Sequence, residues 1–161
     1  MSTADRPAVR RVIEAAAARG LTIDVHTFPE GTKTAPDAAR AVGCDVAQIV
    51  KTLVFVADAT PVIAMVSGRH RLDPAKLARV SGARTTRRAH PDEVRAATGF
   101  AIGGTPPFGH PASLGMYLDE TLLGFDEVWC AAGTPDTVFP VAPGVLREAT
   151  GATVADFHHG E

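Results

Sequence analysis

The segment from Gly99 to Pro111 places the strongest constraint on the fold, because its 13 residues include four glycines and three prolines. Proline fixes φ near about −65° and removes a backbone donor, whereas glycine permits positive φ. Such a segment does not continue as a helix or a central strand. It therefore predicts a rigid turn with an unusual backbone path.

Apolar periodicity and capping residues predict that helices and strands are interleaved along the rest of the chain. The predicted helices are at about 6–19, 35–42, 74–81, 91–98 and 143–150, and the predicted strands are at about 21–28, 50–57, 61–67, 113–118, 127–131 and 138–141. Some connections are short enough for hairpins. We therefore expect a single α/β domain over residues 1–161, with a central mixed or antiparallel sheet surrounded by helices. Residues 1–20 supply the N-terminal helix, and 158–161 are expected to be a frayed tail.

Composition and length are typical of one globular domain, since 161 residues include 45% hydrophobic and 21% charged residues. Apolar runs such as Leu53–Ala57 are far too short to span a bilayer, and no signal peptide is apparent. Cys44 and Cys130 are too far apart for a CxxC motif, and no histidine or cysteine cluster has metal-ligand spacing. We therefore expect a cytoplasmic protein with no membrane contact, no metal and no cofactor.

Charge is concentrated in the middle of the chain. Residues 69–112 carry eight basic and three acidic side chains, whereas residues 113–161 carry one basic and eight acidic. Arg69, Arg71, Arg87 and Arg88 belong to the basic block, which can hold an RNA phosphate backbone. The alternative interpretation is a solvated helix face.

Lys51 lies in the apolar segment Ile49–Phe55, which is predicted to be a strand. A lysine among such neighbours needs a partner for its ammonium group or a cleft to enter. One interpretation is a cation that holds an anionic or carbonyl group of a ligand. The other is a lysine at a strand end whose stem is buried and whose ammonium reaches water.

The segment from Gly103 to His110 is a second candidate, because adjacent glycines let a ligand approach the backbone and prolines hold the backbone dipoles in place. Its alternative is a purely structural turn. His110 is a candidate acid–base or carbonyl-binding group, or else a surface or capping residue. His26 either lines a cleft or faces water. The chain has no GxSxG, GxxxxGK[ST] or HExxH motif, so these residues alone do not name a reaction.

Several segments together resemble the YbaK/EbsC family, which includes editing domains associated with prolyl-tRNA synthetase. They are Val50–Leu53, Val66–Gly68 followed by Leu72 and Asp73, Ala97–His110, and Ala132–Asp136. They occur in the family's order and with similar spacing. The resemblance covers roughly residues 20–157 and implies a YbaK-like mixed α/β fold.

The resemblance also implies an activity: metal-independent hydrolysis of the ester that joins a small, wrongly attached amino acid to tRNA. The expected partners are mischarged tRNA, tRNA(Pro) among the candidates, and an aminoacyl-tRNA synthetase. The expected catalytic residues are Lys51, Gly103 and Gly104, and the expected substrate-binding residues are Thr105, Pro106, Pro107, His110, Gly133, Thr134 and His26. Arg69, Arg71, Arg87 and Arg88 are expected to bind tRNA.

Some relatives carry a histidine near the late glycine turn, but residues 133–137 contain none here. This departure places the transfer of a catalytic histidine in question. Two other functions are compatible with the residues themselves. One is a module that binds tRNA or an aminoacyl group without hydrolysis, and the other is a hydrolase of small activated esters.

Overall fold

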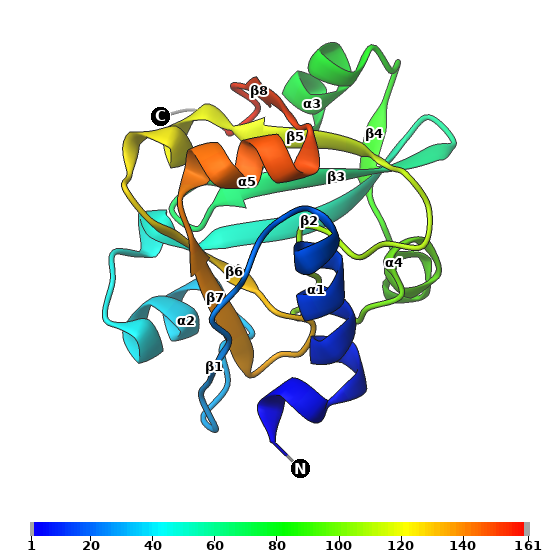
Figure 1. Cartoon of the computed structure of the whole chain (residues 1–161). Coiled ribbons are helices and arrows are strands. Elements are labelled where there is room, and N and C mark those ends of the chain that lie inside the picture. The colour runs from blue at the N-terminus through cyan, green and yellow to red at the C-terminus, as the bar shows by residue number, and fades with distance from the viewer. Residues whose placement is uncertain (1, 160–161) are drawn as a thin grey trace.

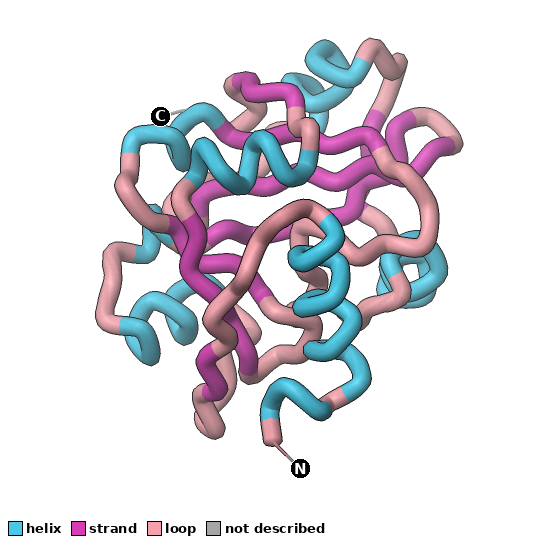
Figure 2. The backbone as a smooth tube through the Cα atoms, viewed as in Figure 1, coloured by secondary structure: helices cyan, strands magenta, loops and turns pink. Residues whose placement is uncertain are grey.

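The computed structural model describes residues 2–159 as a mixed α/β domain with five α-helices and two sheets (Figures 1 and 2). The α-helices are α1 (Pro7–Ala18), α2 (Ala35–Val42), α3 (Pro74–Ser81), α4 (Pro91–Thr98) and α5 (Pro143–Thr150). The strands are β1 (His26–Thr27), β2 (Val50–Ala57), β3 (Thr60–Ser67), β4 (Thr86–Arg88), β5 (Gly115–Asp119), β6 (Val128–Ala131), β7 (Thr137–Val141) and β8 (Thr153–Ala155). Three 3-10 turns are η1 (Thr3–Asp5), η2 (Val46–Gln48) and η3 (Glu120–Gly124).

The helix ends follow directly from proline and glycine. All five helices carry proline at their first or second position, where its missing N–H has no helical partner to lose. Four of them end at a glycine with positive φ: Gly43, Gly82, Gly99 and Gly151. The five predicted helices are therefore confirmed within a residue or two at each end.

The larger sheet has the strand order β4-β2-β3-β5-β8 and is mixed. β2 and β3 form an antiparallel hairpin, whereas β3 pairs with β5 and β5 with β8 in parallel. The smaller sheet, β1-β7-β6, is antiparallel. The predicted mixed sheet is confirmed, although the strands divide between two sheets rather than forming one.

Two expectations from the sequence are wrong, and two short strands were not expected. The strand expected over 21–28 pairs only at His26 and Thr27, because β7 meets no more of it. β4 and β8 were not predicted, since each has only three residues and no alternating pattern of its own. The expected frayed tail is ordered at His158, which forms a bridge with Leu72 and has a side chain only 15% exposed. Residues 160 and 161 lie outside the described residues.

The two faces of the larger sheet carry separate cores. On one face, α1 and α5 lie across the strands, and Val12 and Leu146 pack with Val54 and Ile63 (Figure 1). On the other face, Leu77 of α3 and Phe157 pack with Phe55, Ala64 and Val66. Alternate residues of β2 thus belong to opposite cores, as expected for a strand covered on both sides.

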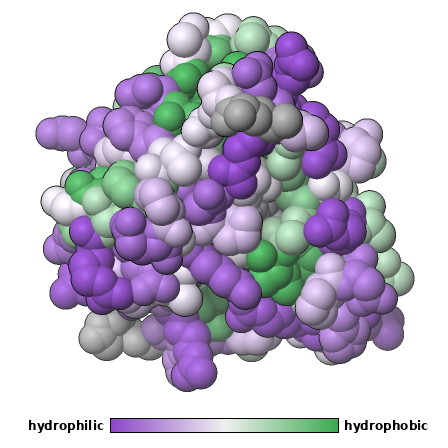
Figure 3. Space-filling view, turned by 90° about the horizontal axis from the view of Figure 1, so that it is seen from below, coloured by the Kyte–Doolittle hydropathy of each residue, from purple (hydrophilic) through white to green (hydrophobic). Residues whose placement is uncertain are grey.

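The surface seen from below is mostly hydrophilic, with hydrophobic residues in small separate patches (Figure 3). Within residues 2–159, no helix has both the length and the apolar character needed to cross a membrane.

Candidate functional site

A cavity of about 350 Å³ lies beside the first half of β2, within the size range of small-molecule sites. β4 pairs only with Phe55–Ala57 in the second half of β2, and one further hydrogen bond joins Ala89 N to Val54 O. The edge of β2 before Val54 is therefore not covered by β4. The cavity is lined by Thr32, Lys33, Thr34, Ala35, Pro36, Ala38, Ile49, Val50, Lys51, Thr52, Leu53, Val54, Arg88, Ala89, Val94, Ile102, Gly103, Thr105, Trp129, Ala131 and Val138.

The lining combines an apolar wall with positive charge. Lys33, Lys51 and Arg88 are its charged members, and no aspartate or glutamate is among the described residues that line it. The N-terminus of α2 also borders the cavity, where Thr34 Oγ1 accepts the Asp37 N–H and the helix dipole adds partial positive charge. This composition suits a ligand with an anionic or electron-rich group and an apolar part.

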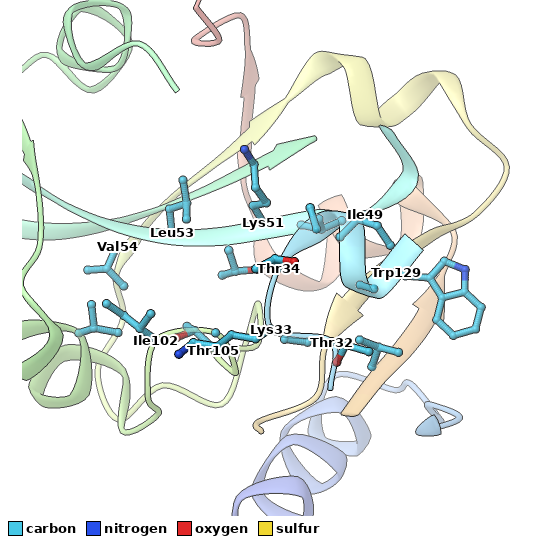
Figure 4. A pocket seen from close by; sticks show the side chains of 18 of the residues that line it. Thr32, Lys33, Thr34, Ile49, Lys51, Leu53, Val54, Ile102, Thr105 and Trp129 are labelled. Atoms are coloured by element: carbon cyan, nitrogen blue, oxygen red, sulfur yellow. The ribbon is translucent and has the colours of Figure 1, made fainter. Parts of the chain in front are cut away.

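Lys51 borders the cavity, but its ammonium group is turned away from the centre. Figure 4 shows Lys51 and Leu53 leaving β2 on the side opposite to Thr34, Val54 and Thr105. The Lys51 ammonium group donates a hydrogen bond to the carbonyl of His70. Lys51 is therefore positioned at the rim of the cavity, on the face of β2 that also carries Leu53 and Phe55 (Figure 4).

Three cations gather at this rim. Arg88 is opposite Phe55 in the sheet and so shares the face of Lys51. Burial lowers the pKa of the Lys51 ammonium; the charges of Arg88 and Arg71 act in the same direction, and Asp119 opposes them. Because like charges held together repel, this cluster favours an anion between them.

Gly103 and Lys33 form the opposite side of the cavity. Gly103 has φ of +88°, and a Cβ built on it would lie 2.8 Å from Lys33 Cγ. The stem of Lys33 therefore lies across the glycine, and its nitrogen lies beside Thr105 in Figure 4. Lys33 is exposed, so its ammonium group can move between water and a ligand.

Internal hydrogen bonds hold the segment around Gly103 in place. Ala101 O accepts from both Gly104 N and Thr105 Oγ1, each at 3.1 Å. His110 Nε2 lies 2.9 Å from Pro106 O, so this nitrogen carries the proton. Burial lowers the pKa of His110, the hydrogen bond to Pro106 opposes that shift, and Arg19 adds to it. The rigid path expected for this segment is what the structure shows.

Gly104 has a packing role rather than a place in the lining. A Cβ at this position would lie 2.8 Å from the main chain of Thr134, so the 133–137 turn packs directly against the loop. Arg6 fixes that turn from outside through two 3.0 Å hydrogen bonds to the carboxylate of Asp136. Thr134 Oγ1 donates to the same carboxylate.

Several predicted substrate-binding residues lie outside the lining of the cavity. Pro106 and Pro107 are buried in the loop behind it, and His110 contacts Pro106 there. Gly133 packs against α1, where a Cβ would lie 2.8 Å from Ala8 O. The His26 ring packs edge-on against Trp129, with 5.2 Å between ring centroids. Their roles in substrate binding stay predictions. The packing contacts also explain structurally why these residue types suit these positions.

The four predicted tRNA-binding arginines are exposed but not equivalent. Arg88 lines the cavity and Arg71 acts on Lys51. Arg87 points to the other face of β4, where both of its terminal nitrogens donate to Glu93 at 2.8 Å. In the part of the chain that the structure describes, no hydrogen bond or ion pair of the Arg69 side chain defines its role, so that role stays a prediction.

Sequence reasoning missed Lys33 and Thr52. Thr52 lines the cavity, and its Oγ1 is buried without a hydrogen-bond partner among the described residues. Its main-chain N–H and C=O point toward the uncovered edge, because they alternate in step with those of Val54. The signal for Thr52 was its place beside Lys51. Lys33 had no signal, since a lysine in a polar loop is ordinary.

The sequence of this chain is similar to those of known proteins. A family model described as "Aminoacyl-tRNA editing domain" matches residues 29–149. A candidate Cys-tRNA(Pro)/Cys-tRNA(Cys) deacylase, EbsC of Enterococcus faecalis, is 31% identical over 130 residues, which is 80% of this chain and 79% of the relative. The proline–tRNA ligase of Citrifermentans bemidjiense is 34% identical over 112 residues, 70% of this chain but 20% of the ligase.

Among solved structures, a candidate trans-editing enzyme for prolyl tRNA synthetase superposes with a TM-score of 0.91 and 49% identity. The match covers 96% of this chain and 99% of that structure. The likeness therefore extends over the whole fold, including both sides of the cavity.

Proposed function

This chain belongs to the aminoacyl-tRNA editing domain family, and we propose that it hydrolyses the ester bond of mischarged tRNA. The observation that carries the proposal is the cavity at the edge of β2, with an apolar wall, the glycine loop on one side and three cations on the other. An aminoacyl ester on a terminal nucleotide has the matching parts: a small side chain, a reactive carbonyl and a phosphate.

The hydrolysis adds water to the ester carbonyl carbon and breaks the bond between that carbon and the ribose oxygen. The amino acid leaves as a carboxylic acid, and the ribose oxygen takes up a proton. The described lining contains no serine, cysteine, histidine or carboxylate, so none of these supplies a nucleophile or general base there. The neighbouring ribose hydroxyl assists the water, and the protein contributes positioning and fixed dipoles.

We assign roles by position around the cavity. The main chain of Gly103 and the side chain of Thr105 face the amino-acid and ester end of the substrate. Lys51, Arg71 and Arg88 hold the terminal phosphate at the rim, where their mutual repulsion is relieved by an anion. Lys33 approaches the ester from the loop side. We assign Lys51 to the phosphate because its ammonium group points away from the centre of the cavity, where the ester is expected to lie.

The substrate proposed is tRNA(Pro) carrying a small non-cognate amino acid, because the relatives are named for Cys-tRNA(Pro) and for prolyl-tRNA synthetase. The editing reaction takes place in the cytoplasm, where tRNA is charged, and a proline–tRNA ligase is the synthetase expected to supply the tRNA. Selection by cavity size alone is limited, since one methylene changes binding by about 1–3 kcal/mol.

The test is release of amino acid from tRNA(Pro) charged in turn with alanine, cysteine, serine, threonine and proline. We expect fast release of one small non-cognate residue, with Lys51→Ala raising KM more than it lowers kcat. Arg79→Ala, an exposed arginine on α3, is the matched control and should behave as wild type. Binding of these tRNAs without release from any of them would support a non-catalytic module instead, and turnover of free amino-acid esters without tRNA would indicate a small-ester hydrolase.

A further inference from the structure

A second cluster of polar side chains lies on the far side of β2 from the cavity. His70, Asp119 and His158 each offer one ligand atom, and these atoms lie within 4.8 Å of one another. They come from the loop after β3, the end of β5 and the C-terminal segment. The sequence predicted no metal because 70, 119 and 158 have no recognisable spacing, but the fold brings them together.

Asp119 is a fully buried carboxylate. Its Oδ2 accepts the Ser67 N–H at 3.1 Å and its Oδ1 accepts the Thr121 N–H at 3.0 Å. Each carboxylate oxygen has a second lone pair, so these bonds leave capacity for a cation. The backbone bonds also fix the direction of the carboxylate, as hydrogen bonds to ligating carboxylates do in metal sites.

His158 provides the independent observation. Its Nδ1 is buried and makes no hydrogen bond among the described residues, although a buried ring nitrogen is normally satisfied. This nitrogen lies 3.6 Å from Asp119 Oδ1 and 3.2 Å from Asp156 Oδ1. Both are ion-pair distances for a protonated ring, whereas a neutral ring places its lone pair beside two carboxylates, where a cation would be stabilised.

The distances are compatible with a transition-metal ion. Zinc binds histidine nitrogen and carboxylate oxygen at about 2.0–2.2 Å, which puts neighbouring ligand atoms of a tetrahedral site roughly 3.4 Å apart. The 3.6 Å between His158 Nδ1 and Asp119 Oδ1 is close to this value. The His70 ring stacks on His158 with 3.9 Å between centroids and an angle of 11°. Because the lone pair of a ring nitrogen lies in the ring plane, one of the two rings must rotate out of the stack for both to bind the same ion.

We propose that His70, Asp119 and His158 form a binding site for a zinc-type divalent metal ion that fastens the C-terminal segment to the sheet. Two imidazoles and a carboxylate are ligands that suit zinc better than magnesium or calcium. Thr121 Oγ1, 3.1 Å from His70 Nε2, orients the His70 ring. The bound ion adds to the existing contacts of this segment, in which Asp73 N donates to Phe157 O.

Lys51 links this site to the cavity, because its ammonium group donates to the His70 carbonyl. Lys51, Arg71 and Lys76 are positive groups nearby, and Asp119 and Asp156 are negative ones; Lys76 pairs with Asp156 at 3.4 Å. Because Lys76 already pairs with Asp156, Asp119 is the carboxylate that offsets the charge of the ion directly. Metal binding at His70 thus fixes the loop that holds the ammonium group of Lys51.

The experiment is titration of tag-free protein with Zn²⁺ alone, followed by calorimetry and thermal unfolding, with Mg²⁺ as the comparison ion. We expect one Zn²⁺ per chain and a Tm increase of about 5–10 °C at 100 times the Kd. His158→Ala should weaken binding more than about 100-fold, since even loss of an outer partner costs about 10- to 100-fold. Thr121→Val removes the hydroxyl that orients the His70 ring, and it should weaken Zn²⁺ binding by about 10- to 100-fold.

His159→Ala is the matched control, because His159 is the exposed neighbour of His158 and its loss should leave Zn²⁺ binding unchanged. If Asp119→Asn does not fold, His70→Ala and His158→Ala test the ligands independently. Absence of Zn²⁺ binding would overturn the proposal, as would binding that survives in His158→Ala or is lost only in His159→Ala. The readout does not depend on deacylation, so it separates this proposal from the proposed function.

Discussion

The side chain of Lys33 lies across Gly103 so closely that a Cβ on the glycine would come within 2.8 Å of Lys33 Cγ. Two parts of the chain that are 70 residues apart thus form one wall of the cavity. The contact requires glycine for two separate reasons, the space and the φ of +88°. It also places a mobile cation over the loop that we propose positions the ester.

We predict that Gly103→Ala is destabilised by about 1–2 kcal/mol through backbone strain and loses deacylation by more than about tenfold. Adding Lys33→Ala should relieve the clash but not the strain, so activity should stay low. Chemical unfolding and single-turnover release measure the two effects. Gly124→Ala is the control, because nothing lies within 4 Å of its new Cβ; normal activity in Gly103→Ala would contradict the assigned role.

Neighbouring arginines on β4 should respond differently to substitution. Arg88→Ala is expected to raise KM for charged tRNA about tenfold and to reduce the salt dependence of binding by about one unit of slope. Arg87→Ala should change neither, because Glu93 already holds Arg87 on the other face. Binding measured across a range of salt concentrations distinguishes them, and equal effects of the two changes would argue against a phosphate site at the rim.

Two threonines in the cavity should show opposite effects on stability when each is changed to valine. Thr52→Val removes a buried hydroxyl that has no hydrogen-bond partner within residues 2–159, and it should be neutral or raise stability by about 1 kcal/mol. Thr105→Val removes a hydrogen bond to Ala101 O and should lower stability by about 1 kcal/mol. Urea unfolding measures both free energies. A lower stability in Thr52→Val would mean that the Thr52 hydroxyl has a partner in the folded protein.

The ion pair between Arg6 and Asp136 should make stability depend on pH. The hydrogen bonds from Arg6 hold the pKa of Asp136 below its usual value, with burial opposing and Thr134 assisting. The ion pair therefore contributes its full stabilisation above the pKa of Asp136 in the unfolded chain, about 3.9. This stabilisation is lost as pH falls through the lower pKa of Asp136 in the folded protein. Arg6→Ala should cost up to about 1 kcal/mol at neutral pH.

That difference between wild type and Arg6→Ala should vanish in strongly acidic solution. Thermal unfolding from pH 7 to pH 2 follows it, with Arg79→Ala as an arginine control outside this contact. A difference that is constant across the whole range would show that the Arg6 stem, rather than its charge, supplies the stability.

His110 should produce a second pH effect at a higher pH. Burial lowers its folded pKa, so below the unfolded pKa of about 6.5 the unfolded chain binds a proton that the folded chain does not. Stability should therefore fall as pH drops from about 6.5 toward the folded value. His110→Gln should remove this dependence, and NMR titration of the ring gives the folded pKa directly. A folded pKa above 6.5 would reverse the sign and refute the assignment.

Most of the fold was predictable because its signals are local. Proline at the helix starts and glycine after the helix ends mark α2, α3 and α4 within a few residues of the chain. The β2–β3 hairpin likewise follows from two apolar runs and a short turn. β4 and β8 were not predictable, because each is a strand only through its pairing with β2 or β5.

From the residues themselves, the site was predictable mainly where the residue type was unusual for its surroundings; the family resemblance added Thr105, and the basic block added Arg88. Lys51 in an apolar strand and Gly103 in a rigid loop are such residues, and both line the cavity. The direction of Lys51 was not predictable, since it depends on the His70 carbonyl that lies beyond the end of β3. His158 was wrongly expected to lie in a frayed tail. Its contact with Asp119 joins positions 39 residues apart, so no local pattern in the sequence reveals it.

The most direct test of the central claim is multiple-turnover release of amino acid from mischarged tRNA(Pro), with the protein in catalytic amount. We predict repeated turnover of a small non-cognate aminoacyl ester, little release of proline, and loss of turnover in Gly103→Ala but not in Gly124→Ala. Absence of release from every mischarged tRNA(Pro), or turnover equally fast in Gly103→Ala, would contradict the assignment of this cavity as a deacylase site.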